Sequence, residues 1–108
     1  MTRAAFELHT DRLGAAPPHV AVSGEVDVTN AHDFAESVAA LPGPRPLVLE
    51  LSHLGYLDSA GFAALDRLLA DDAVVLVLAP GSPIRRAAEL VHLPFHADAA
   101  TAVRSLGD

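Results

Sequence analysis

The sequence contains no cysteine, no lysine and no tryptophan. Without cysteine the chain can form neither disulfides nor thiolate metal sites, and a cysteine nucleophile is excluded. Without lysine it lacks the cationic residue of a phosphate-binding GxxxxGK[ST] loop and the amine of Schiff-base chemistry. Nucleotide hydrolysis by this chain alone is therefore not expected.

Positive charge is also scarce, because seven arginines stand against fourteen acids and give a formal net charge of −7. Proteins bind nucleic acids mainly through basic groups that neutralise phosphates, so no direct nucleic-acid partner is expected. No apolar run reaches the roughly 20 residues of a membrane span. His9, Asp11 and Arg12 interrupt the region where a signal peptide would be apolar. We therefore expect a cytoplasmic protein.

Hydrophobic residues are abundant, at 51% of 108 residues, although only 5% of the chain is aromatic. The core must therefore be built from Ala, Val and Leu in closely packed layers. A chain of this length usually buries one core and seldom divides. We expect one domain over residues 1–108.

Apolar periodicity predicts an α/β fold. Strand patterns occur in "FELHTDRL" from residue 6, "HVAVSGEV" from 19, "PLVLEL" at 46–51 and "AVVLVLA" at 73–79. Helical patterns occur in "NAHDFAESVAAL" at 30–41, "SAGFAALDRLLA" at 59–70, "GSPIRRAAELVHL" at 81–93, and 99–106. A short extended piece near Phe95 adds an optional strand. The order β-β-α-β-α-β-α-(β)-α predicts a mixed sheet of four to five strands, opened by a hairpin, with about four helices.

Polar residues next to these patterns mark the expected helix starts. Thr29 or Asn30 is available to cap the first helix, and Asp98 the last. Ser82 would cap the third helix, with Pro83 at its first position.

Two loops bring polar side chains to the carboxyl edge of the predicted sheet, where functional loops of α/β proteins lie. "SGEVDVTN" at 23–30 carries Glu25 and Asp27, and "LGYLDSAG" at 54–61 carries Asp58 and Ser59. If the strands before these loops are neighbours, Asp27 and Ser59 lie close together despite their separation in sequence.

The residues themselves leave two interpretations of Ser59 open. Either Asp58 or Ser59 simply caps the helix, or the hydroxyl of Ser59 is a modification site. A helix N-terminus accommodates phosphate because its unpaired N–H groups and dipole favour an anion. Asp27 could equally be a capping or turn-forming acid, and Glu25 a solvated side chain at a strand end.

Two other kinds of chemistry are less well supported. A nucleophilic serine on a strand-to-helix elbow needs the motif GxSxG, but Leu57 occupies the position of the first glycine. His92 and His96 could be proposed as the catalytic base, but Pro94 lies between them, so they do not share one face of a helix. Serine hydrolysis is thus a remote alternative. The six histidines are scattered without the spacing of a metal site, so no metal is expected.

"GEVD" after the second strand, and "LDSAG" entering a helix after "PLVLELSHLGY", resemble the two signatures of the STAS family, whose bacterial members include anti-sigma factor antagonists. The resemblance covers about residues 6–106, which would form the core of a single STAS domain. Ala60 stands where many members have a second small hydroxyl residue.

The resemblance implies a switch in which Ser59 is phosphorylated by an anti-sigma factor that is itself a serine kinase. Only the unphosphorylated antagonist would bind this kinase and free the sigma factor, and a phosphatase would restore the hydroxyl. ATP and magnesium would belong to the kinase, so the chain would be no enzyme, with no catalytic residues and no cofactor. The residues implied to support partner binding or phosphorylation are Glu25, Asp27, Thr29, Asp58, Ala60 and Gly61.

The same resemblance leaves another function open. A STAS module can be a constitutive docking subunit, for instance of a lipid transporter's ATPase or of a stress-signalling assembly, without any phosphorylation. The hydroxyl of Ser59 favours the switch.

Overall fold

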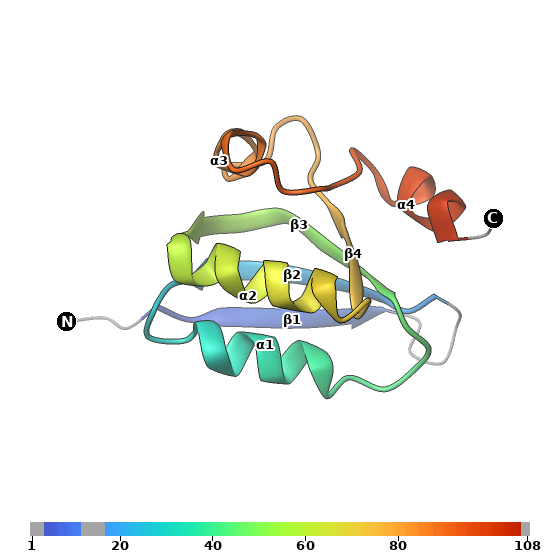
Figure 1. Cartoon of the computed structure of the whole chain (residues 1–108), viewed down its shortest axis with the longest axis horizontal. Coiled ribbons are helices and arrows are strands. Elements are labelled where there is room, and N and C mark those ends of the chain that lie inside the picture. The colour runs from blue at the N-terminus through green and yellow to red at the C-terminus, as the bar shows by residue number, and fades with distance from the viewer. Residues whose placement is uncertain (1–3, 12–16, 107–108) are drawn as a thin grey trace.

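The structure is a computed structural model that describes residues 4–11 and 17–106 (Figure 1). One four-stranded sheet has the order β1-β2-β3-β4, in which β1 is antiparallel to β2 and the other strands run parallel. Helices α1 and α2 connect successive strands, and α3 and α4 follow the last strand, so the predicted α/β fold with a mixed sheet is confirmed. The elements are β1 (Phe6–Asp11), β2 (His19–Val26), α1 (Ala31–Ala39), β3 (Leu47–Leu57), α2 (Ser59–Ala70), β4 (Val74–Val77), α3 (Arg85–Leu90) and α4 (Ala99–Leu106).

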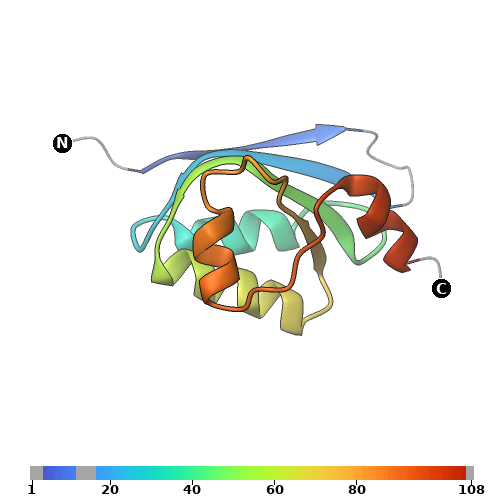
Figure 2. The ribbon, with the colours of Figure 1, turned by 90° about the horizontal axis from the view of Figure 1, so that it is seen from above.

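Helices α1 and α2 lie side by side on one face of the sheet (Figure 2). The main core forms between them and the strands, because alternate strand residues point to the same face. Phe34 of α1 is fully buried and meets Phe6 of β1 edge to face, with ring centroids 5.4 Å apart. The helical spacing predicts a stripe of Phe62, Leu65 and Leu68 or Leu69 on α2; Leu65 and Leu68 are buried, and Phe62 and Leu69 are partly buried against the core.

Helix α4 covers part of the opposite face, where Ala102 packs against Val48 of β3 and Val77 of β4. Asp98 precedes this helix, and its carboxylate accepts a hydrogen bond from the Thr101 amide at 2.7 Å, as an N-cap does. None of the helices in residues 4–11 and 17–106 is long and apolar enough to span a bilayer.

The predicted hairpin of β1 and β2 is confirmed. Its predicted turn is "GAAPP" at 14–18, of which residues 14–16 lie outside the described residues. The optional fifth strand reduces to a single bridge between Val77 and His96. There the His96 amide donates to the carbonyl of Leu76 and the Leu78 amide donates to the carbonyl of His96. This bridge covers part of the outer edge of β4.

Three predicted boundaries were wrong. β3 does not stop at residue 51 but continues to Leu57, because β2 remains its hydrogen-bonded neighbour along this stretch. β4 is shorter than predicted, with only Val74–Val77 in the ladder. Helix α3 begins at Arg85 and not beside Ser82, because Ser82 and Pro83 form a turn in which the Arg85 amide donates to the Ser82 carbonyl.

Candidate functional site

The candidate site lies where β2 and β3 end together. These strands are parallel neighbours, and Val26 is paired with Leu57 in the last step of their ladder. The turn that follows β2 and the start of α2 therefore lie at the same end of the molecule, on the left in Figure 1. This confirms the expectation that the two polar loops meet at one edge of the sheet.

Asp58 connects these two loops through its side chain. It is the N-cap residue of α2, and its Oδ1 accepts a hydrogen bond from the Gly61 amide at 3.0 Å. Its Oδ2 accepts a hydrogen bond from the Val28 amide, 30 residues earlier in the chain, at 3.1 Å. The carboxylate thus fills both the capping role and a bridging role, and it holds the β2–α1 turn against the start of α2.

Ser59 follows as the first residue of α2, and it is exposed. Its hydroxyl makes no hydrogen bond with any residue that the structure describes. The Ser59 and Ala60 amides also lack acceptors within these residues, as expected for the first turn of a helix. Because Asp58 caps the helix, the interpretation of Ser59 as the cap is wrong, and Ser59 is an exposed residue in the first turn, where N–H groups are unpaired.

Asp27 makes hydrogen bonds within its own turn. Its Oδ1 accepts from the Thr29 amide at 2.8 Å and from the Thr29 hydroxyl at 2.5 Å. Its carbonyl accepts from the amides of Asn30 and Ala31. Asp27 and Thr29 therefore shape the β2–α1 turn, which is the turn-forming interpretation that the sequence left open.

Asn30 is a site residue whose role the sequence did not reveal. It is the one polar residue buried in the described part of the chain, with 8% of its surface exposed. It occupies the predicted N-cap position of α1, but its side chain makes no capping bond. Instead its Nδ2 donates to the Glu25 carbonyl at 3.0 Å and its Oδ1 accepts from the Asp27 amide at 2.9 Å. The side-chain amide of Asn30 therefore stabilises the turn through two hydrogen bonds to its backbone.

Two large hydrophobic side chains are exposed to solvent at this edge of the sheet. Val28 is 76% exposed at the tip of the turn, and Tyr56 is 51% exposed near the end of β3, where it pairs with Glu25. Glu25 itself is exposed. We call Val28, Tyr56, Asp58 and Ser59 the Ser59 surface. An apolar residue placed between Asp27 and Thr29 in a turn was the signal in the sequence that could have indicated it.

Gly61 allows the start of α2 to approach the strands closely. A Cβ atom on this residue would lie 2.2 Å from Leu57 Cδ1 and 3.3 Å from the carbonyl oxygen of Val26. Gly61 is also buried, whereas Ala60 is half-buried against the core. These two small residues of "LDSAG" thus let the helix seat at the ends of β2 and β3, and this geometry places Ser59 at the surface.

No hydrogen bond joins Ser59 to a histidine among the described residues. His96 is engaged in the bridge to β4, and His92 is exposed beyond the end of α3. Within the same residues no group of three or more His, Asp or Glu side chains could hold a metal ion. The chemistry that the geometry offers is therefore an accessible hydroxyl beside a carboxylate and a helix N-terminus.

Comparison with known proteins places this geometry in a family. No curated protein matches the sequence. A solved structure, the crystal structure of an anti-sigma factor antagonist from Mycobacterium paratuberculosis, is similar with a TM-score of 0.77 and 22% sequence identity over 96% of each chain. A sequence model of the STAS_2 family, described as "Mlab, STAS domain", matches residues 9–93. With a family match over most of its length and the fold of a solved relative, the chain belongs to the STAS domain family.

Proposed function

We propose that this protein is an anti-sigma factor antagonist whose affinity for an anti-sigma factor serine kinase is set by phosphorylation of Ser59. The observation that carries the proposal is the division of roles at the start of α2. Asp58 supplies the N-cap, so the exposed hydroxyl of Ser59 has no structural bond to maintain. The similar solved structure of an anti-sigma factor antagonist supports this choice within the family.

The unphosphorylated form would bind the kinase through the Ser59 surface. Val28 and Tyr56 are the exposed apolar side chains at this edge, and such residues next to polar ones are typical of an interaction surface. The hydrogen bond between Asp58 and Val28 fixes the turn before binding. A surface ordered in advance loses less conformational entropy when a partner docks. Binding would occupy the kinase and thereby free the sigma factor in the cytoplasm.

Phosphorylation would reverse the binding through charge. The kinase supplies ATP and Mg²⁺, the Ser59 oxygen forms a bond to the γ-phosphorus, ADP leaves, and the hydroxyl proton passes to a base of the kinase or to water. The new group carries about −1.5 to −2 charges beside the carboxylate of Asp58. The unpaired amides of the first helical turn favour the phosphate, while the added charge repels an acidic partner surface. A phosphatase would hydrolyse the ester and restore binding.

In this scheme the chain is a substrate and a regulator, and it needs no cofactor of its own. Glu25 and Asp27 would add negative charge near the phosphate. Thr29 would contribute by holding the β2–α1 turn, and Ala60 and Gly61 by letting the start of α2 pack closely against the strands.

The test is phosphorylation by a candidate anti-sigma factor kinase with ATP and Mg²⁺, followed by intact mass. We expect the mass of one phosphate on the wild type and none on Ser59→Ala. Ser37→Ala is the matched control, because Ser37 is an exposed serine on α1, and it should be phosphorylated like the wild type. Phosphate that persists in Ser59→Ala would contradict the proposal, as would an unmodified wild type with its cognate kinase.

A second candidate function is constitutive docking without phosphorylation. It is favoured by the description of the matching family model, "Mlab, STAS domain", which differs from that of the similar solved structure. The two functions separate in a titration of the partner with Ser59→Asp. A loss of affinity of tenfold or more supports the switch, whereas equal affinity of Ser59→Asp and the wild type supports constitutive docking.

A further inference from the structure

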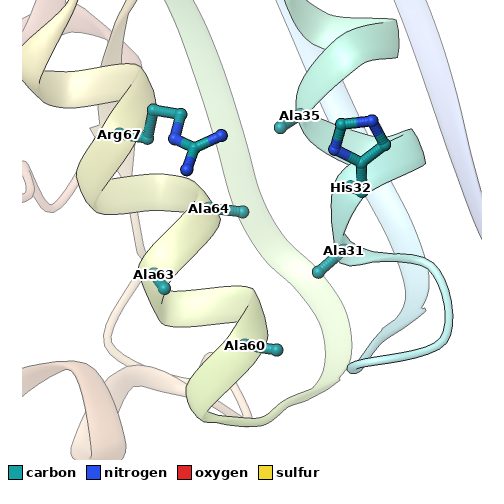
Figure 3. Close-up of a pocket in the computed structure, with 7 residues that line it drawn as sticks. All are labelled: Ala31, His32, Ala35, Ala60, Ala63, Ala64 and Arg67. Atoms are coloured by element: carbon teal, nitrogen blue, oxygen red, sulfur yellow. The ribbon is translucent and has the colours of Figure 1, made fainter.

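A groove between α1 and α2 begins one residue beyond Ser59. It has a volume of about 190 Å³ and is open to solvent (Figure 3). Its walls are five alanines, of which Ala31 and Ala35 come from α1 and Ala60, Ala63 and Ala64 from α2. Because alanine side chains are short, the two helices leave space between them that larger residues would fill.

The groove is lined by an arginine, although the chain as a whole is strongly acidic. Arg67 and His32 complete the lining, and no carboxylate takes part in it. Arg67 extends from α2 toward α1 in Figure 3. Its guanidinium forms no ion pair or hydrogen bond with the residues in the described ranges, whereas Nε2 of His32 lies 2.8 Å from a Glu36 oxygen. The groove therefore holds an arginine whose charge is available to a partner.

The groove also continues the Ser59 surface. Ala60, Ala64 and Arg67 follow one another at helical spacings of four and three residues, so they form one row along α2. This row starts in the first turn of the helix, next to Ser59, and leads away from the edge of the sheet toward the last turn. A partner seated on Ser59 would therefore meet the alanine walls first and Arg67 farther along.

We propose that this groove is the second contact region for the anti-sigma factor kinase, and that its occupant is a segment of the kinase that carries a carboxylate next to a medium-sized apolar side chain. The alanine walls provide room for the apolar group, and Arg67 provides two parallel N–H donors for the carboxylate. This inference rests on the proposed function. It specifies the partner's chemistry at a site separate from the phosphorylated hydroxyl.

The first test compares two charge-removing variants in a titration with the kinase that phosphorylates Ser59. Arg67→Gln should weaken binding at least tenfold and reduce its dependence on salt, because a charge-assisted pair is lost. Arg104→Gln is the matched control, since Arg104 is exposed on α4 at the other face of the sheet, and its affinity should stay within twofold of the wild type. Thermal melting of both variants verifies that they are folded.

The second test uses the absence of cysteine, which makes any introduced thiol unique. Ala63→Cys places a thiol in the groove, and Ala100→Cys places one on the exposed side of α4. Bound kinase should slow alkylation of the first thiol at least tenfold and leave the second unchanged. The rate is read by intact mass after reaction with iodoacetamide.

The outcomes separate this inference from the proposed function. If the wild type binds and is phosphorylated, but Arg67→Gln binds equally well and the Ala63→Cys thiol stays reactive, the groove inference is wrong and the proposed function stands. If the wild type does not bind the kinase, both are overturned. Protection of the Ala63→Cys thiol that grows with the concentration of this chain alone would indicate a second copy as the occupant, and it would also overturn the inference.

Discussion

The carboxylate of Asp58 joins two segments that lie 30 residues apart. One oxygen accepts from the Gly61 amide in α2 at 3.0 Å, and the other accepts from the Val28 amide at 3.1 Å. The same side chain therefore starts the helix that presents Ser59 and holds the turn that presents Val28. Each of the two hydrogen bonds uses a different oxygen of Asp58. A substitution that changes only one of these atoms can therefore separate the capping of α2 from the support of the turn.

Asp58→Asn should break one of these links and keep the other. The Asn oxygen still accepts from the Gly61 amide, since Asn is as good an N-cap as Asp, but its NH₂ group cannot accept from the Val28 amide. We expect faster hydrogen exchange at the Val28 amide and unchanged exchange at Gly61. Asp58→Ala should accelerate both amides. Protection of Val28 in Asp58→Asn equal to that of the wild type would show that the bridge does not hold the turn.

The cap and its neighbour should differ in their effects on stability. Asp58→Ala should lower the free energy of unfolding by about 0.5–2 kcal/mol, as loss of an N-cap does. Ser59→Ala should change it by less than about 0.5 kcal/mol, because the exposed hydroxyl makes no hydrogen bond with the described residues. Urea denaturation measures both. A larger loss in Ser59→Ala than in Asp58→Ala would return the capping role to Ser59.

Gly61→Ala should destabilise the protein by about 1–3 kcal/mol, because the new methyl group would press against the buried Leu57 side chain. This reverses the usual effect, since alanine normally stabilises a helix relative to glycine. Gly81→Ala is the control, because no described residue other than its chain neighbours comes within 4 Å of the position of its added Cβ. Thermal and urea unfolding should show a loss only in Gly61→Ala, and equal stability of both variants would contradict the close packing.

Asn30→Ala should loosen the β2–α1 turn. The substitution leaves the Glu25 carbonyl and the Asp27 amide without their side-chain partner, at a cost of about 1–3 kcal/mol. It should also weaken partner binding, because Val28 loses its support. Stability and affinity measured in parallel provide the check. Full stability in Asn30→Ala would show that water replaces both hydrogen bonds.

The capping bond of α4 should make part of the stability depend on acid. The hydrogen bond from the Thr101 amide holds the pKa of Asp98 below its ordinary value of 3.8. The folded state therefore favours the charged form, and this contribution is present above the unfolded pKa and is lost as the pH falls through the folded one. An NMR titration should find Asp98 below 3.8. Asp98→Asn, which keeps the cap, should have a smaller acid dependence, and an Asp98 pKa at or above the ordinary value would contradict the capping bond.

Much of the architecture could be predicted because local patterns specify it. The apolar spacing of "SAGFAALDRLLA" predicted a helix over 59–70, and α2 spans Ser59–Ala70. The boundaries of β3 and α3 could not be predicted in this way. β3 extends to Leu57 because β2 pairs with it, and α3 starts at Arg85 because a turn at Ser82 comes first. The ends of these elements depend on contacts with neighbouring segments, which the local apolar pattern of the sequence does not contain.

For the site, the sequence alone predicted which polar residues lie at the candidate site, and it determined that two loops share one edge, because parallel strands end on the same side of a sheet. It left open which of Asp58 and Ser59 caps α2. Only the tertiary structure decided this, by bringing the Val28 and Gly61 amides to the two oxygens of one carboxylate. It also brought Arg67 and His32 to one groove, since helix packing, and not sequence separation, sets the distance between α1 and α2.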